Sequence, residues 1–524
     1  MINYWWVTRP KRKLDSIPQV LALFAKQAID QVWNGQRASH LSIEEALEES
    51  GLKRTGLRRD HTGGGGRTYM AWLKSLGLLF QQKETKEIKL TLAGEAIMNG
   101  ESPVEILRDQ IIKYQIPSSF SISRGVNVSR RFKVHPFWFL FRLLTDDRLG
   151  WLTQEEIAKI VITEGESDKE NCIEKVIEHI IRFREEGDQC LDKDFIEKYK
   201  TSKGLINLAD PYGHLRDVAN TLVNWLEYTQ YITRDDGKIT ILDDARKEAE
   251  RIAANPPAFI ARPDDEEFFQ RRYGLDPHHK KDTRNLLDTH TITPKIVAEM
   301  IVKQAFVELT LEKPIMGISG SLVNEITEKT GLDQGLVAET LEKYYPHGAV
   351  SAFLSTYFNM AFNGKEECRD FEIATANIFK DIFHFTSRHI AGGAKEVPDV
   401  LLVSDEDGWQ AIIDTKAYSR YELPADQRDR MIYHYLPEIG KYSDSPYPLA
   451  FFSYIAGGFK PTIDKALEKI VQAAGINGSA MPVRNFIRLA EMQNKHPYTH
   501  REIRNIFSLN KRIDITDIER PQIQ

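Results

Sequence analysis

A short segment in the C-terminal part of the chain carries two aspartates and a lysine at a spacing that could support chemistry on a phosphate. Asp399 precedes a run of β-forming residues, 400–403, and Asp414 and Lys416 end a second such run that begins at Trp409. Carboxylate oxygens are ligands that Mg²⁺ prefers, and an ammonium group can stabilise charge that develops on a phosphate. Metal-assisted hydrolysis of a phosphodiester uses this combination of groups.

The two runs are expected to form a β-hairpin that brings these groups together. Between them lies 404–408, Ser-Asp-Glu-Asp-Gly, whose composition is typical of a turn. Side chains alternate along a strand, so Asp414 and Lys416 should share one face while Ile413 and Thr415 point to the other. An antiparallel hairpin would also place Asp399 close to Asp414. The residues therefore predict a Mg²⁺ site formed by the two aspartates, with the lysine beside it.

A simpler interpretation of the same residues stays open at this point. An Asp-x-Lys sequence at the end of a strand is commonly an exposed ion pair, and Pro398-Asp399 is commonly just a turn.

The flanking sequence resembles the cleavage domain of the FokI family of type IIS restriction endonucleases, a branch of the PD-(D/E)xK nucleases. The matching elements are Gly392-Gly393 before Pro398-Asp399, the string Asp-Thr-Lys-Ala-Tyr-Ser at 414–419, Leu423-Pro424, and Ser453 followed by Gly458-Phe459-Lys460. The resemblance covers residues 335–524. It implies an α/β nuclease fold with a central mixed sheet flanked by helices.

Site residues follow from the same resemblance. Asp399 and Asp414 would hold Mg²⁺ together with a main-chain carbonyl of Ile413 or Thr415, and Lys416 would contact the attacking water or stabilise the transition-state charge. Glu372 matches an acidic residue near the site in many relatives, which makes it a fourth candidate catalytic residue. A carboxylate that interacts with the positive end of its own helix is the alternative interpretation of Glu372.

The N-terminal part has the pattern of a winged-helix module. The expected elements are a helix at 43–50 capped by Ser42 and ended by Gly51, a glycine loop at 63–66, a helix at 69–76, and wing strands at 78–80 and 88–92. A second unit repeats this order, with a helix around Trp225 and strands at 231–233 and 238–242. Residues 151–158 are expected to be its opening helix. Generic helical packing remains the alternative for the second unit.

The N-terminal half also resembles the AlwI-type endonucleases, in which a DNA-recognition half is joined to a nuclease half. The resemblance lies around 67–80, 90–94 and 111–115.

Charge is distributed unevenly along the chain. The net charge of −6 is unremarkable, but residues 51–150 carry 17 Lys/Arg against 9 Asp/Glu, whereas residues 151–200 carry 8 against 14. A locally basic surface is what contact with a phosphate backbone requires. The candidate DNA-contacting residues are Arg58, Arg59, Arg67, Tyr69, Lys74, Arg130, Arg131 and Lys133. The alternative is that the basic residues simply solvate a surface.

Taken in order, the chain is predicted to be an α+β multidomain protein with a mostly helical N-terminal half. The segments are a winged-helix DNA-recognition domain at 1–125, a second winged-helix-like one at 126–258, a linker with bridging helices at 259–334, and a PD-(D/E)xK nuclease domain at 335–524. No apolar run approaches the ~20 residues that span a bilayer, and no secretory signal is expected. With three cysteines at no metal-ligand spacing, we expect a cytoplasmic protein.

The leading functional hypothesis is a type IIS restriction endonuclease that binds a short asymmetric duplex sequence and cuts at a fixed offset with Mg²⁺. The alternatives are a strand-specific nicking enzyme, the large subunit of a heterodimeric one, and a non-catalytic DNA-binding regulator. FokI-type cleavage domains pair through an Asp and an Arg one turn apart. Asp429 matches the Asp, but Tyr433 stands at the Arg position. The partners expected are double-stranded DNA and either a second copy, joined transiently on DNA, or a small nuclease subunit.

Overall fold

The computed structural model describes residues 1–33, 37–54, 63–122, 126–287, 293–362, 364, 368–390 and 397–518. The chain divides into two compact units. Unit 1 comprises Met1–Leu309 with Ile318–Pro346, and unit 2 comprises Thr310–Gly317 with His347–Gln524.

Unit 2 is built on one mixed sheet. Its strands are β6 (Thr386–His389), β7 (Val400–Ser404), β8 (Trp409–Lys416), β9 (Leu449–Ala456) and β10 (Asn477–Pro482), in the order β10-β9-β8-β7-β6. The pairs β6–β7 and β7–β8 are antiparallel, whereas β8–β9 and β9–β10 are parallel. The expected α+β class with a mixed sheet in the C-terminal part is confirmed.

The hairpin predicted from the residue pattern is present. Its register runs from Val400 opposite Ile413 to Ser404 opposite Trp409. Gly408 adopts φ +66° in the turn, a conformation that costs glycine little.

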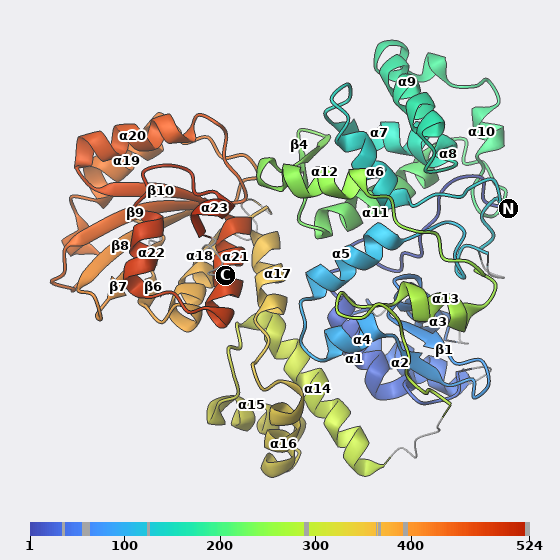
Figure 1. Cartoon of the computed structure of the whole chain (residues 1–524), viewed down its shortest axis with the longest axis horizontal. Helices are drawn as coiled ribbons and strands as arrows, with labels where there is room; N and C mark the ends of the chain where they lie inside the picture. Colours follow the sequence, from blue (N-terminus) through green and yellow to red (C-terminus); the bar gives the residue numbers. More distant parts are fainter. Residues whose placement is uncertain are drawn as a thin grey trace. The chain divides into compact units, whose positions relative to one another are not determined.

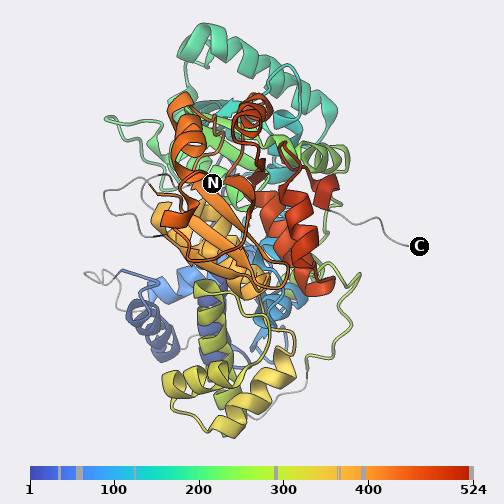
Figure 2. The same cartoon turned by 90° about the vertical axis from the view of Figure 1, so that its left-hand side faces the viewer.

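Helices cover both faces of this sheet (Figure 1). They are α17 (Ser351–Met360), α18 (Cys368–Asn377), α19 (Ala425–Arg430), α20 (Ile463–Ala474), α21 (Val483–Lys495), α22 (His500–Phe507) and α23 (Ile515–Ile518), with π-helical turns η5 (Ile378–Ile382) and η6 (Met431–Tyr435) and a 3₁₀ turn η7 (Ile439–Lys441). In Figure 1, α19 and α20 lie on one side of the strands, and α18, α21 and α22 lie on the other. Figure 2 shows the red C-terminal helices packed along one side of the orange strands.

Each face of the sheet has its own core. On the α18–α22 side, Phe486 is the centre of an aromatic cluster, with ring centroids 5.0 Å from Phe379, 5.9 Å from Tyr357 and 6.0 Å from Phe383. On the α20 side, residues such as Ile412 and Phe452 pack against apolar residues of α20. Burial on both faces explains why β7 and β8 are apolar almost throughout.

Unit 1 is mostly helical. Its helices are α1 (Ile17–Ala28), α2 (Arg37–Glu49), α3 (Gly64–Ser75), α4 (Leu92–Met98), α5 (Pro103–Lys113), α6 (Pro136–Leu144), α7 (Gln154–Glu156), α8 (Ile162–Glu164), α9 (Glu170–Glu186), α10 (Phe195–Lys198), α11 (Gly213–Tyr228), α12 (Arg246–Ala254), α13 (Glu266–Tyr273), α14 (Pro294–Glu312), α15 (Gly320–Thr330) and α16 (Gln334–Tyr344), with a π-helical segment η1 (Ile157–Val161) and 3₁₀ turns η2 (Gly187–Cys190) and η3 (Asp243–Ala245). Two small antiparallel sheets complete it: β1 (Leu79–Gln81) with β2 (Ile88–Leu90), and β3 (Leu152–Thr153), β5 (Lys238–Ile241) and β4 (Ile232–Asp235).

A helix followed by two paired strands occurs twice in unit 1, as α3-β1-β2 and as α11-β4-β5. This order agrees with the repeat seen in the sequence. Both helices bury a tryptophan, Trp72 in α3 and Trp225 in α11. The assignment of either module as a winged helix stays a prediction.

The start of the first module differs from expectation. Helix α2 begins at Arg37, so Ser42 lies inside the helix and does not cap it. Gly51, at φ +70°, follows the end of this helix as expected.

The glycine run was expected to be a loop, and that prediction is wrong. Gly63, at φ +77°, precedes α3, and the next three glycines form the first turn of the helix. A Cβ at Gly65 would lie 2.5 Å from the Glu44 carboxylate, and one at Gly66 would lie 2.6 Å from the carbonyl oxygen of His40. The glycines therefore permit a close approach of α3 to α2, which outweighs their low helix propensity.

The segment predicted as a linker contains a packed helix. In α13, Phe269 and Tyr273 are buried. The Tyr273 hydroxyl donates to the carbonyl of Gln110 at 2.9 Å, and Gln270 Nε2 donates to the carbonyl of Lys74 at 2.8 Å. These contacts fix α13 against the first module, because a buried polar group without its partner would cost free energy.

None of the helices in the described ranges combines the length and apolar character needed to cross a membrane.

The aromatic cluster makes a testable prediction about unit 2. Phe486→Ala should destabilise this unit by about 3–5 kcal/mol, because it removes the ring on which the cluster packs. Amides of β9 should then exchange hydrogen at least about 100-fold faster in the full chain, as measured by mass spectrometry. Leu509→Ala, at an exposed position, is the control, and equal exchange in the two variants would contradict the assigned core.

Candidate active site

Asp399, Asp414 and Lys416 converge at one end of the hairpin. The Lys416 ammonium Nζ lies 2.7 Å from Asp414 Oδ2. Asp399 Oδ2 accepts hydrogen bonds from the Thr415 backbone N–H at 2.6 Å and from the Thr415 hydroxyl at 3.0 Å. Asp399, the residue before β7, is thereby fixed to the end of β8, between the two charged residues of that strand.

Strand alternation places Asp414 and Lys416 on one face, as predicted. Asp414 is paired in parallel register with Tyr454 of β9, and Lys416 is paired with Ala456. Both partners belong to the core on the α20 side of the sheet. Asp414 and Lys416 therefore lie on the face of the sheet that packs against the core on the α20 side.

Burial excludes the interpretation of this Asp-x-Lys as an exposed ion pair. Asp414 is 3% exposed, and the Lys416 side chain is 16% exposed. Removing such charges from water costs several kcal/mol per ion, which a structural ion pair seldom recovers in full.

The electrostatics of the site show carboxylates that repel one another. Burial, then the nearby Asp414, and further the Glu372 carboxylate raise the pKa of Asp399, against the opposing effects of Lys416 and the Thr415 amide. Burial alone would lower the pKa of Lys416, but the Asp414 and Asp399 carboxylates outweigh it and raise that pKa. Lys416 therefore stays protonated at neutral pH. A cation bound between Asp399 and Asp414 would reduce the repulsion between their two carboxylates.

Glu372 lies close enough to act on Asp399, and it has a partner that the sequence did not reveal. From α18, its Oε2 lies 2.8 Å from Nε2 of His389, the last residue of β6. The next residue, Ile390, donates its backbone N–H to the carbonyl of Asp399 at 2.8 Å. The structure thus brings all four predicted catalytic residues to one end of the sheet, although their roles stay predictions.

Tyrosines line the site, and sequence reasoning did not single them out. Burial and then Asp414 raise the pKa of Tyr435 to about 12. The hydroxyls of Tyr421 and Tyr454 are buried and have no hydrogen-bond partner among the described residues. Only the parallel pairing of β8 with β9, a contact between distant segments, places Tyr454 beside Asp414. The sequence of β9 is apolar almost throughout and therefore gave no signal that places Tyr454 at the site.

The donor set fits a hard divalent cation. Asp399 and Asp414 each engage Oδ2 in a hydrogen bond or ion pair, and within the described ranges Oδ1 of neither has a hydrogen-bond donor. Two carboxylate oxygens and water suffice for Mg²⁺, which usually keeps several waters. No cluster of three or more His, Cys, Asp or Glu that could hold a metal occurs among the described residues.

Several predicted DNA-contacting residues have partners within unit 1. The Tyr69 hydroxyl donates to the carbonyl of Leu52 at 3.1 Å, and buried Lys74 lies 2.7 Å from Glu266. Contact of Lys74 with DNA would require this pair to open. Arg58 and Arg59 lie outside the described residues.

Among the remaining candidate DNA-contacting residues, one is held by contacts within unit 1 and three are exposed. Arg131 donates to the carbonyl of Thr163 at 2.6 Å and to Asn3 Oδ1 at 2.7 Å, and it pairs with Glu166. Its guanidinium therefore ties together segments of unit 1. Arg67, Arg130 and Lys133 are exposed.

Two family models match the chain. Residues 331–514 match the FokI cleavage domain, and residues 74–304 match the AlwI restriction endonuclease. The type II restriction enzyme FokI of Planomicrobium okeanokoites is 25% identical over 179 residues, which are 32% of this chain and 30% of that protein. The matched part of the chain thus spans less than a third of that relative. The resemblance to both families predicted from the sequence is confirmed.

Solved structures give a weaker likeness. The structure of restriction endonuclease FokI has 15% identity and a TM-score of 0.28, covering 98% of this chain and 100% of that one, and FokI bound to DNA has 14% and 0.28 over the same shares. The BpuJ1 endonuclease binding domain, in complex with pyrene- and phenanthrene-modified DNA, has 17% and 0.35 over 52% of this chain and 96% of that one.

The raised pKa of Asp399 predicts how stability depends on pH without metal. An unfolded aspartate titrates near pH ~3.9, so above that pH the unfolded state is ionised while folded Asp399 still favours its proton. Asp399 therefore lowers stability as pH rises toward its folded pKa, and Asp399→Asn should remove this loss. In EDTA at pH 7 the variant should melt at a higher temperature than wild type.

Asp407→Asn, in the exposed hairpin turn, is the matched control and should leave the melting temperature unchanged. An Asp399→Asn protein no more stable than this control at neutral pH would contradict the electrostatic assignment.

Proposed function

We propose that this protein is a type IIS restriction endonuclease that binds a short asymmetric duplex sequence and hydrolyses phosphodiester bonds at a fixed offset with Mg²⁺. The observation that carries the proposal is the buried arrangement of Asp399, Asp414 and Lys416 inside the segment that matches the FokI cleavage domain. Recognition is assigned to residues 1–258 and cleavage to residues 335–524, with 259–334 between them.

The finer fold assignments belong to the same proposal. The antiparallel hairpin followed by two parallel strands, with the acidic residues at its end, supports a PD-(D/E)xK fold for the nuclease domain. The two helix-and-two-strand modules support winged helices for the recognition domains, 1–125 and 126–258.

The chain's own residues supply three parts of the reaction. Asp399 and Asp414, with the carbonyl of Ile413 or Thr415, hold the cation, and Mg²⁺ bound there would neutralise the scissile phosphate and activate a water. Lys416 keeps its proton, so it acts as a donor to the attacking water or to the charged transition state, and it does not act as the base. Glu372 adds negative charge at this end of the sheet and holds His389.

A non-catalytic DNA-binding regulator fits the structure less well. Burying Asp399, Asp414 and Lys416 together costs stability, and an apolar replacement of the same volume is often neutral or stabilising. A scaffold without catalysis would gain nothing from retaining the three charges. A strand-specific nicking enzyme, or the large subunit of a heterodimeric one, would have the same site and differs only in how many strands it cuts.

Cleavage of both strands requires two nuclease domains, since one site faces one scissile phosphate at a time. The segment after the site, α19 with η6, exposes Asp429, whose side chain is 50% exposed, and Tyr433, which is 67% exposed. Asp429 lies 3.0 Å from Arg428, its neighbour in the chain. This surface supports transient pairing of two copies on DNA, or pairing with a small nuclease subunit.

Asp414→Ala should abolish cleavage while duplex binding is retained, because the lost ligand lies in the nuclease domain. Lys416→Ala should reduce the cleavage rate by about 100-fold or more, as loss of one transition-state donor does elsewhere. Plasmid cleavage followed by run-off sequencing measures the rate, recognition sequence, offset and number of strands together. Asp407→Asn is the matched control, and cutting by Asp414→Ala at the rate of this control would refute the site assignment.

Asp429→Arg should leave the first nick unchanged and slow the second cut. The substitution removes the carboxylate that pairs with Arg428 and places a second cation beside it, so the surfaces of two copies would both be positive and would repel. Nicked circles should accumulate before linear DNA at low protein concentration, as seen on gels over time. Asp444→Arg, which makes the same change at another exposed position of unit 2, is the control and should leave both cuts unchanged. Concerted cutting by the Asp429 variant, with no nicked intermediate, would rule out this interface.

A further inference from the structure

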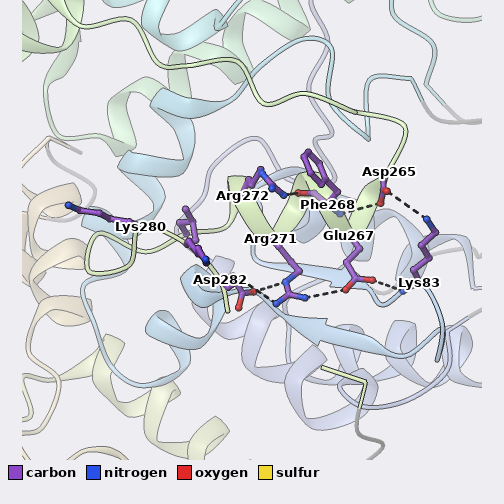
Figure 3. A pocket seen from close by; sticks show the side chains of 10 residues that line it. Lys83, Asp265, Glu267, Phe268, Arg271, Arg272, Lys280 and Asp282 are labelled. Atoms are coloured by element: carbon purple, nitrogen blue, oxygen red, sulfur yellow. Dashed lines mark hydrogen bonds and ion pairs between the residues drawn. The ribbon is translucent and has the colours of Figure 1, made fainter. Parts of the chain in front are cut away.

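A cleft of about 560 Å³ lies in unit 1 beside the turn that joins β1 to β2 (Figure 3). It is bordered by α13 and by the segment that follows this helix. Its lining is mostly charged: Lys83, Asp265, Glu267, Arg271, Arg272, Lys280, Lys281 and Asp282, together with Phe268 and Leu275. The sequence predicted this part of the chain to be a linker, so none of the candidate DNA-contacting residues lines the cleft.

The acidic residues of the cleft are all engaged. Asp265 caps α13 by accepting from the Phe268 backbone N–H at 3.2 Å. Glu267 accepts from the Lys83 backbone N–H at 2.9 Å and lies 3.5 Å from Arg271. Figure 3 shows these contacts as one connected network on the side of the cleft nearer Lys83.

Asp282 is engaged in the same way. It pairs with Arg284 at 2.8 Å and with Arg271 at 3.3 Å. The negative charge of the lining is therefore largely offset by Arg271, Arg284 and the N-terminus of α13.

Three cations of the lining have no carboxylate partner within the described ranges. Arg272, Lys280 and Lys281 are exposed. In Figure 3, Arg272 and Lys280 lie on the side of the cleft away from the Lys83–Asp265 pair. The arrangement thus separates a neutralised side from a positive rim.

The rim is held in a defined conformation. The Arg272 guanidinium lies 3.5 Å from the centre of the Phe268 ring and donates to the Phe268 carbonyl at 3.1 Å. The buried side chain of Asp276 accepts from the backbone N–H groups of His278 and His279, each at 2.9 Å. The segment that carries the two lysines is therefore anchored just before them, which lowers the entropy lost on binding.

We propose that this cleft binds the sugar-phosphate backbone of duplex DNA through Arg272, Lys280 and Lys281. The inference rests on the proposed function, and it adds to the DNA-binding surface of unit 1 a part of the 259–334 segment. Exposed cations that have no carboxylate partner within the described ranges suit a ligand that presents successive phosphates, and such contacts contribute affinity without reading sequence.

The alternative source of phosphate is a small polyphosphate or nucleotide, for which the cleft volume is adequate. Two guanidinium groups already lie against Phe268, that of Arg272 and that of Arg262 at 4.7 Å. The ring is thus not left bare for a nucleotide base to stack on. The cations also lie along an exposed rim and do not converge in an enclosed pocket, and both features favour the continuous backbone.

The test compares the salt dependence of binding in two double variants of the full chain. Lys280→Ala/Lys281→Ala removes two rim cations, and Lys193→Ala/Lys203→Ala removes two exposed lysines of unit 1 outside the cleft. A fluorescent duplex of random sequence is titrated in EDTA between about 50 and 200 mM salt. The slope of log K against log salt should fall in magnitude by about 1.8 in the cleft variant, at about 0.9 per phosphate contact, and stay unchanged in the control.

Adding Arg272→Ala to the cleft variant should reduce the magnitude of the slope by about a further 0.9. Equal slopes in the cleft variant and wild type would overturn the inference. Tripolyphosphate binding, measured by calorimetry, forms the second arm. If the cleft variant loses tripolyphosphate binding but keeps the wild-type slope on DNA, the cleft takes a free polyphosphate and the DNA assignment is wrong.

Failure of the proposed function looks different from failure of this inference. If the proposed function is wrong, the wild-type protein either binds no duplex or binds duplex and does not cut it with Mg²⁺. If only the cleft is wrong, wild-type binding and cleavage are intact and the slope of the cleft variant is unchanged. Equal melting temperatures of both double variants verify that the fold is retained.

Discussion

The contact on which the candidate site depends is the hydrogen bond from the Thr415 backbone amide to Asp399 Oδ2. It sets the register of β7 against β8, and a slip of one residue would move Asp414 and Lys416 to the opposite face. The parallel pairing of β8 with β9 then determines what surrounds them, because Tyr454 lies beside Asp414. The helices on both faces keep this register by burying the apolar residues between the charged ones.

The hairpin and the faces of its residues could be predicted because both depend on local pattern. A polar turn between two apolar runs is visible within about twenty residues, and the alternation of faces follows from the geometry of any strand. The burial of the charged pair could not be predicted in this way, since it depends on β9 and on α20. The same limit applies in unit 1: Lys74 is held by Glu266, 192 residues away, and Gly65 and Gly66 are required by the approach of α2. Helix propensity alone predicted a loop at these glycines, whereas the packing of α3 against α2 places them in a helix.

Charge along the chain is informative only after internal partners are assigned. The basic excess in residues 51–150 suggested a DNA-binding surface, yet Lys74 and Arg131 are committed to contacts inside unit 1. Lys280 and Lys281, in a segment whose composition resembled a linker, have no such commitment within the described ranges. The cations that remain after internal pairing, and not those that are dense in sequence, define where a polyanion can bind.

The replacement of an arginine by Tyr433 bears on how two copies would pair under the proposed function. An Asp–Arg contact between exposed residues contributes little stability and is weakened by salt. A tyrosine that is 67% exposed instead offers apolar area with a polar tip, as is common at the centre of protein interfaces. Pairing through Tyr433 would then depend on the burial of apolar area more than on charge. The affinity of the two copies for each other would therefore change less with salt concentration than their affinity for DNA. Because phosphate contacts weaken steeply with salt, the second cut would become limited by DNA affinity before it became limited by pairing of the nuclease domains.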